Sequence, residues 1–180
     1  LYVFRYSELL FEYNASSWLI GTPAIGNIDD DDQLEIIVGG FSSSGKKIYA
    51  INHDGSDVDN YPILIDEKIQ KGVALFDFNN NSKDDIVFGT DDDNIYLMYD
   101  DGTIAPGFPV NGDGKFRTEP LIIDYNNEPV IITASQEGTL YGINSDGSLR
   151  FEYSTNYDIT TSPSIHTVNS QLFVVFGNSN

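Results

Sequence analysis

The sequence predicts an all-β fold, a β-propeller made of four-stranded antiparallel blades. The aromatic fraction of 13%, with 11 Tyr and 11 Phe, suits strands better than helices, and the 40% hydrophobic content is enough for a substantial core. Two hairpin patterns alternate and recur about every 45 residues, and no stretch shows the helical periodicity of an amphipathic helix. Two hairpins supply four strands in the length of one propeller blade. The chain therefore contains about four blade repeats.

One hairpin pattern carries a tyrosine near its start. The four tyrosines are Tyr2, Tyr49, Tyr96 and Tyr141, separated by 47, 47 and 45 positions. The copies are LYVFRYSELLFEY from Leu1, IYAINHDGSDVDNYPI from Ile48, IYLMYDDGTIAPGFPV from Ile95 and LYGINSDGSLRFEY from Leu140. The last three place an Asp-Gly pair between alternating apolar residues, which is typical of a tight antiparallel turn. Each copy predicts a hairpin.

The other hairpin pattern starts at Pro23, Val73, Pro120 and Pro163, and we expect its first strand to be the innermost of each blade. The predicted organisation is a single domain over residues 1–180. It has an outer hairpin in 1–20, full units in 21–70, 71–117 and 118–160, and an inner hairpin in 161–180. Since one sheet cannot bury both its faces alone, neighbouring blades must stack face to face.

The two ends of the chain carry complementary halves of one repeat, an outer hairpin at the start and an inner hairpin at the end. Joined head to tail, FVVFGNSN and LYVFRYSELLFEY would make one continuous blade. Two alternatives follow: a slice of a larger propeller, which we favour, or a closed four-bladed ring whose last blade is shared between the termini. The first residue is Leu, not Met, so a processed product, a domain or a fragment is expected.

An acidic loop lies between the two apolar strands of the first unit. Oxygen-bearing side chains occupy positions 1, 3, 5 and 9 of this loop, at Asn27, Asp29, Asp31 and Glu35. Alternate residues of a tight turn point inward, and the backbone carbonyl of Gln33 at position 7 would complete the set. Such all-oxygen sets suit Ca²⁺, which takes six to eight ligands at about 2.3–2.6 Å and tolerates irregular geometry.

The same spacing recurs fifty positions later in VALFDFNNNSKDDIVFG. The matching residues are Asp77, Asn79, Asn81 and Asp85, with the carbonyl of Lys83 at position 7. The alternative is that acidic turns only keep hairpins soluble, but solubility does not require matching positions. Two calcium sites are therefore predicted. The third and fourth units, with DYNNEP from Asp124 and HTVNSQ from His166, are too short and too poor in acids to hold an ion.

The acidic loop, the apolar strand that ends in Gly and the tyrosine hairpin together resemble the FG-GAP repeats, also called VCBS repeats, of integrin-like β-propellers. The resemblance implies Ca²⁺ bound in both loops. Family members usually have Gly after the third ligand, where the backbone is left-handed, and this chain has Asp32 and Ser82 there. Asp tolerates that conformation better than Ser. A weaker resemblance links the tyrosine hairpins to PQQ-like propeller repeats.

The two loops differ in charge. The first offers three carboxylates and the second two, with neutral Asn79 and Asn81 between them. Because calcium affinity follows ligand charge and rigidity, we expect the first loop to bind calcium more tightly. The left-handed preference of Asp32 over Ser82 favours the same order.

The charge of the chain limits its partners. The formal net charge is −19, so nucleic acid and anionic membrane surfaces would be repelled. No stretch has the roughly 18 apolar residues of a membrane span. There is no cysteine, and His53 and His166 are the only histidines, so a nucleophile with an oriented base is not indicated.

The function expected from these features is a non-catalytic, calcium-stabilised binding or scaffold module of a secreted or cell-surface protein. Its ligand would be a protein or a carbohydrate. The alternative is a segment of a propeller enzyme, such as a calcium-dependent polysaccharide lyase, whose catalytic residues lie outside this chain. A convergent cluster of Lys, Arg, His and Tyr would favour the enzyme, and the 9 Lys and Arg are scattered along the sequence.

Overall fold

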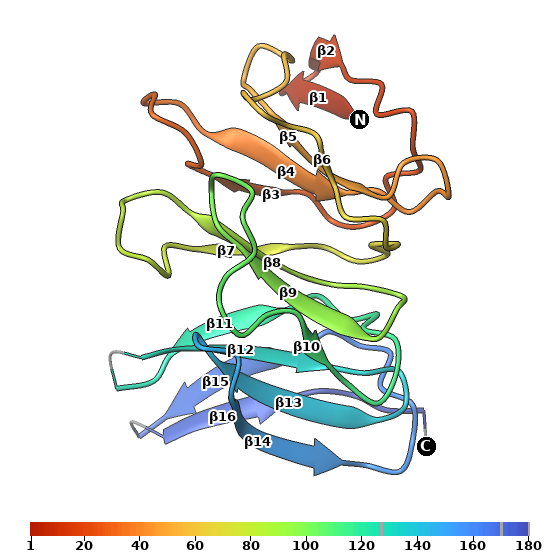
Figure 1. Cartoon of the computed structure of the whole chain (residues 1–180), viewed down its shortest axis with the longest axis vertical. Coiled ribbons are helices and arrows are strands. Elements are labelled where there is room, and N and C mark those ends of the chain that lie inside the picture. The colour runs from red at the N-terminus through yellow and green to blue at the C-terminus, as the bar shows by residue number, and fades with distance from the viewer. Residues whose placement is uncertain (127, 170, 180) are drawn as a thin grey trace.

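The computed structural model describes residues 1–126, 128–169 and 171–179, and within them the chain is all antiparallel β-structure with no helix (Figure 1). Asn127, Ser170 and Asn180 of the third and fourth units lie outside the described residues. The all-β prediction is confirmed. No helix in the described part is long and apolar enough to cross a membrane.

Three sheets have four strands each. The first contains β3 (Ala24–Gly26), β4 (Glu35–Gly39), β5 (Lys47–Ile51) and β6 (Ile63–Leu64). The second contains β7 (Ala74–Phe76), β8 (Asp85–Gly89), β9 (Asn94–Met98) and β10 (Val110–Asn111). The third contains β11 (Leu121–Asp124), β12 (Pro129–Ala134), β13 (Thr139–Asn144) and β14 (Leu149–Ser154). Each sheet is two consecutive hairpins, as the repeat predicts.

A two-stranded hairpin lies at each end of this stack. β1 (Tyr2–Arg5) pairs with β2 (Glu8–Glu12), and β15 (Ser164–Val168) pairs with β16 (Gln171–Val175). These hairpins form separate sheets at opposite ends of the molecule (Figure 1). The described residues therefore form an open stack of blades and not a closed ring.

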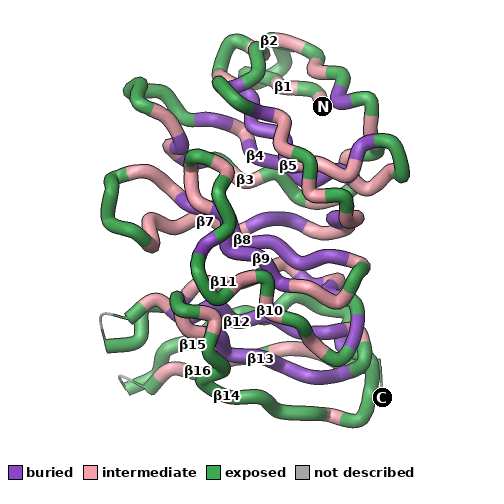
Figure 2. The backbone as a smooth tube through the Cα atoms, viewed as in Figure 1, coloured by how far each residue is buried: buried purple, intermediate pink, exposed green. Residues whose placement is uncertain are grey.

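The sheets follow one another along the long axis, and the first strands β3, β7 and β11 contact one another in succession. Apolar side chains fill the spaces between the sheets, and the central strands carry most of the buried residues (Figure 2). The repeated tyrosine is part of this packing, because Tyr49, Tyr96 and Tyr141 are buried. Tyr2, in the hairpin at the N-terminal end, is 61% exposed.

The outer strands differ from the expected hairpins. In the first two sheets only an isolated bridge follows the Asp-Gly turn, and the fourth strand is the two-residue β6 or β10. Pro62 and Pro109 directly precede these strands, and proline has no N–H to donate to a ladder. In the third sheet, where no proline intervenes, β14 pairs with β13 directly after the turn.

The register is the same in all three sheets. Ile36 of β4, Ile86 of β8 and Ile131 of β12 each pair with the residue two positions after the repeated tyrosine. The acids Glu35 and Asp85, one residue earlier, are therefore structurally equivalent. In the third sheet this position is occupied by Val130, which is buried.

Candidate metal centre

The first acidic loop runs from the end of β3 to the start of β4. One carboxylate oxygen from each of Asp29, Asp31 and Glu35 lies within 4.8 Å of the other two. Glu35 is fully buried because it opens a central strand, whereas Asp31 is exposed. The loop therefore brings together three of the predicted ligands, and this cluster could hold a cation.

Two buried oxygens of the same loop lack a hydrogen-bond partner: Asn27 Oδ1 and Glu35 Oε1. The other Glu35 oxygen, Oε2, accepts the N–H of Ile28 at 3.0 Å. Buried polar atoms are nearly always hydrogen-bonded, so an orphaned pair at ligand positions needs an explanation. A cation held by Asn27, Glu35 and the two aspartates would satisfy both atoms, and the residues fit an oxygen-loving ion.

The loop is folded by its own carboxylates. Asp29 Oδ1 accepts the N–H of Asp31 at 2.9 Å, and Asp31 Oδ1 accepts the N–H of Gln33 at 2.6 Å. Burial raises the pKa of Glu35, and the charges of Asp29 and Asp31 raise it further, whereas the N–H of Ile28 opposes the rise. Three carboxylates in this space therefore favour a counter-charge, either a proton or a metal ion.

The second loop, between β7 and β8, binds its oxygens internally. Asp77 Oδ1 accepts the N–H of Asn81 at 3.0 Å, and Asp77 Oδ2 accepts that of Ser82 at 2.8 Å. Asn79 Oδ1 also accepts the Asn81 N–H, at 3.0 Å. Asn81 Oδ1 accepts the N–H of Lys83 at 2.9 Å. Each of these predicted ligands thus already has a protein donor.

Asp85 is equivalent to Glu35 and is also fully buried. Its Oδ2 accepts the N–H of Phe78 at 2.8 Å, and its Oδ1 accepts the N–H of Asp100 at 3.1 Å and the Asn79 amide at 3.4 Å. Burial raises the pKa of Asp85 to about 6, although these N–H groups oppose the rise. No oxygen of Asp85 is left without a donor.

The backbone conformation of the residue after the third ligand, Asp32 or Ser82, differs from the sequence-based expectation that both are left-handed. Ser82 is left-handed, with φ of 71°, whereas Asp32 is not among the residues of positive φ. The preference of Asp over Ser for that conformation therefore gives no support to tighter binding by the first loop. The two loops share their ligand positions but not their backbone path.

The two loops are hydrogen-bonded to each other. The N–H of Asn27 donates to Asp84 Oδ2 at 3.1 Å, and the N–H of Asp84 donates to the carbonyl of Asn27 at 2.6 Å. Lys83 Nζ lies 2.8 Å from Asp30 of the first loop and 3.6 Å from Asp100.

These contacts do not follow from the ligand spacing, because Asp84 and Asp30 lie at even positions of their loops. The glycine at position 26 is the sequence signal, because a Cβ there would collide with Asp84 Oδ2. A side chain at Gly26 would therefore displace the Asp84 carboxylate from Asn27.

Comparisons with known proteins support the fold. Neither a protein-family profile nor a curated protein sequence matches the chain. The structure of BamB from Moraxella catarrhalis superposes with a TM-score of 0.65 at 15% identity, over 93% of this chain and 47% of that one. The V. cholerae biofilm matrix protein Bap1 gives 0.63 at 17% identity, over 88% of this chain and 28% of that one.

BBS1N, whose structure was solved in complex with ARL6DN, gives a TM-score of 0.60 at 14% identity, over 86% of this chain and 47% of that one. The chain thus spans half or less of the length of these three structures. At these identities the likeness concerns the fold alone. The neighbours are propeller-like, and the fold of this chain is a stack of β-propeller blades.

Proposed function

We propose that the chain is a calcium-stabilised, non-catalytic binding module. The observation that carries the proposal is the first acidic loop, where three carboxylates converge and two buried oxygens have no hydrogen-bond partner. Asn27, Asp29, Asp31 and Glu35 would hold the ion with their side chains, and Gln33 would use its carbonyl. The resemblance of this loop to FG-GAP repeats supports the same assignment.

Calcium fits this loop better than other hard cations. Mg²⁺ demands a near-ideal octahedron and keeps several waters, whereas Ca²⁺ accepts an irregular set of carboxylate, amide and carbonyl oxygens. The bound ion would neutralise the charge of Asp29, Asp31 and Glu35 and so stabilise the turn between β3 and β4. We propose a secreted or cell-surface location, where calcium-binding modules work with Kd values of about 10⁻⁴–10⁻³ M.

A binding role agrees with the rest of the molecule. The histidines are in separate units, His53 in the turn after β5 and His166 in β15, so they do not form one catalytic group. BBS1N shows that a structure of similar fold takes a protein partner, and we propose a protein ligand here before a carbohydrate. Clefts between neighbouring blades offer places for such a ligand.

A calcium titration tests the proposal. The purified chain is melted in a chelator, in excess Ca²⁺ and in equal Mg²⁺. Binding to the folded state alone stabilises by about 2.7 kcal/mol at a hundredfold excess over Kd, which is about 5–10 °C for a domain of this size. Magnesium should give a smaller shift. Superimposable melting curves in chelator and calcium would exclude a structural calcium ion.

A further inference from the structure

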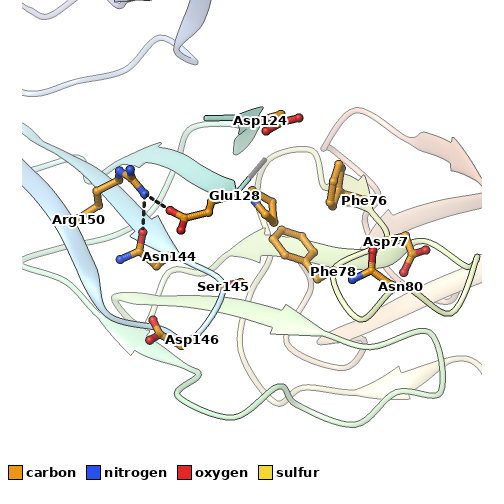
Figure 3. Close-up of a pocket in the computed structure, with 11 residues that line it drawn as sticks. Phe76, Asp77, Phe78, Asn80, Asp124, Glu128, Asn144, Ser145, Asp146 and Arg150 are labelled. Carbon is orange, nitrogen blue, oxygen red and sulfur yellow. Dashed lines mark hydrogen bonds and ion pairs between the residues drawn. The ribbon is translucent and has the colours of Figure 1, made fainter. Parts of the chain in front are cut away.

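A cleft of about 610 Å³ opens between the second and third sheets, on the rim that carries the acidic loops (Figure 3). A corresponding cleft of about 630 Å³ lies between the first and second sheets. The equal register of the sheets makes the two clefts comparable position by position. Their linings differ in aromatic surface and in the position of the basic side chain.

Of the two clefts, the one between the second and third sheets has aromatic residues among its described lining residues, and the other has none. Phe76 and Phe78 line it, with ring centroids 5.2 Å apart in an edge-to-face arrangement. The equivalent residues of the first loop are Gly26 and Ile28. In Figure 3 the ring of Phe78 lies between Asp124 and Asp146, and Phe76 lies beside it. This cleft thus has an aromatic floor and a carboxylate rim.

In the other cleft Lys83 pairs with two of the lining carboxylates, Asp30 and Asp100. The other aspartates of that lining form no ion pair with a described residue: Asp29, Asp31, Asp59 and Asp101. In the cleft between the second and third sheets, the connection from β11 to β12 is shorter and supplies no such lysine. The only basic side chain of its lining, Arg150, lies at one end, bonded to Glu128 at 3.1 Å. Three carboxylates of the lining form no ion pair with a described residue: Asp77, Asp124 and Asp146.

Asp124 is the most available of these groups. Asp77 and Asp146 accept backbone N–H groups within their own turns. Asp124 is exposed at the end of β11, where its backbone pairs with Pro129, and its carboxylate forms no hydrogen bond or ion pair with a described residue. A cation above the phenylalanine rings would therefore meet an unpaired carboxylate.

Arg150 is an example, within the molecule, of an arginine that contacts an aromatic ring and a carboxylate together. Its guanidinium lies 4.7 Å from the ring centroid of Tyr125 while it pairs with Glu128 and with Asn144 at 3.2 Å. Guanidinium groups are attracted both to aromatic faces and to carboxylates. One end of the cleft thus already holds an arginine between a ring and an acid.

We propose that the cleft between the second and third blades binds an arginine side chain of a protein partner. Its stem and guanidinium would pack on Phe76 and Phe78, with the charge directed to Asp124. Arginine is enriched among the residues that anchor protein interfaces. The inference rests on the proposed binding role and names the chemistry of the partner.

Amide-resolved NMR titration tests the proposal with the whole chain. The probe is Nα-acetyl-arginine methylamide, and the control is the citrulline analogue, which has nearly the same shape and no charge. The proposal predicts saturable shifts at Phe76, Phe78 and Asp124 with the arginine probe, weaker at high salt. Equal shifts with the citrulline analogue, or shifts only in the cleft between the first and second sheets, would overturn the proposal.

Two variants locate the binding, with one matched control. Asp124→Asn removes the unpaired charge, and Phe78→Ile introduces the residue found at the equivalent position of the first loop. Each should weaken arginine binding about threefold or more. Asp59→Asn removes one charge from the other cleft and should leave the affinity unchanged. If Asp59→Asn weakens binding as much as Asp124→Asn, the net negative charge of the chain explains arginine binding, and the proposed cleft is not the site.

The titration is repeated in chelator and in calcium, so that the two proposals are judged separately. Asp124 and Phe78 are not calcium ligands of either loop. Arginine binding in a chain whose melting does not respond to calcium would overturn the calcium role and keep the cleft. A calcium response without arginine binding would overturn the cleft alone.

Discussion

The two acidic loops place the same kinds of residue at the same positions, yet they differ in what their oxygens already bind. In the second loop, Asp77 and Asp85 each accept N–H groups on both carboxylate oxygens. In the first, Glu35 Oε1 and Asn27 Oδ1 are buried and accept none. The second loop thus satisfies its own acceptors, whereas the first leaves acceptors for an ion.

The same ligand spacing is therefore compatible with two different states of the acceptor oxygens. A lone pair that already accepts a backbone N–H must give up that bond, or share it, when a cation arrives. The first loop keeps three carboxylates within 4.8 Å of one another and faces no such exchange at Glu35 Oε1. The tighter calcium site is therefore expected at the first loop, on grounds of free acceptors as well as charge.

The largest expected effect is on stability without metal, where substitution of the buried Asp85 should cost more than substitution of the buried Glu35. Asp85→Ala leaves the N–H groups of Phe78 and Asp100 without an acceptor, so unfolding free energy in chelator should fall by about 2–5 kcal/mol. Glu35→Ala orphans only the N–H of Ile28 and removes an unpaired buried oxygen, so the loss should be about 1–2 kcal/mol. Urea denaturation measures both. A larger loss for Glu35→Ala would reverse the comparison.

For calcium binding the order should be reversed, so that a substitution in the first loop has the larger effect. Asp31→Ala removes a carboxylate of the first loop and should abolish most of the calcium stabilisation, about 2.7 kcal/mol at a hundredfold excess over Kd. Asn81→Ala, its match in the second loop, should leave that stabilisation in place. Titration calorimetry follows each variant. A high-affinity phase that survives Asp31→Ala and vanishes with Asn81→Ala would show that the second loop is the main site.

The bond between the loops predicts a smaller effect. Asp84→Ala deprives the N–H of Asn27 of its side-chain acceptor and should cost about 1 kcal/mol of stability. Because Asn27 is a predicted ligand of the first loop, its calcium affinity should fall as well. Asp84→Asn keeps an acceptor oxygen and is the matched control. Unchanged calcium affinity in Asp84→Ala would mean that the first loop does not depend on the second.

Much of the fold is predictable from the sequence because each blade repeat shows the same local sequence patterns. The tyrosines at Tyr49, Tyr96 and Tyr141 set the period, and alternating apolar residues set the strands. The short outer strands β6 and β10 are harder to predict, since Pro62 and Pro109 act against an apolar pattern that continues past the turn. The sequence also allows a closed ring, which the separate hairpins β1–β2 and β15–β16 do not form.

The candidate site is predictable only in part. The positions of Asp29, Asp31 and Glu35 follow from spacing, because a tight turn points alternate residues inward. The bond of Asn27 to Asp84 joins residues 57 positions apart and depends on how two blades stack. Which oxygens stay unpaired depends on backbone details such as the left-handed Ser82, and those details are not visible in the ligand pattern.

The last prediction concerns Lys83, which joins the two loops by charge. Lys83→Met removes an ion pair with exposed Asp30 and a longer one, 3.6 Å, with Asp100. Because the Asp100 carboxylate keeps the Asn81 amide as a donor, stability should change by about 1 kcal/mol or less. The backbone carbonyl of Lys83 is retained. Removing a positive charge beside the first loop makes its potential more negative, so calcium affinity there should rise about threefold at low salt and less at high salt.

Lys46→Met is the matched control, because Lys46 pairs with Asp66 in the connection from β6 to β7, away from both loops. It changes the net charge by the same amount and should shift calcium affinity less. Calorimetry at two salt concentrations measures both variants. Equal gains in the two would mean that only net charge matters, and a loss of affinity in Lys83→Met would mean that the Asp30 contact holds the first loop in its binding conformation. In that case geometry, and not charge, would decide the difference between the loops.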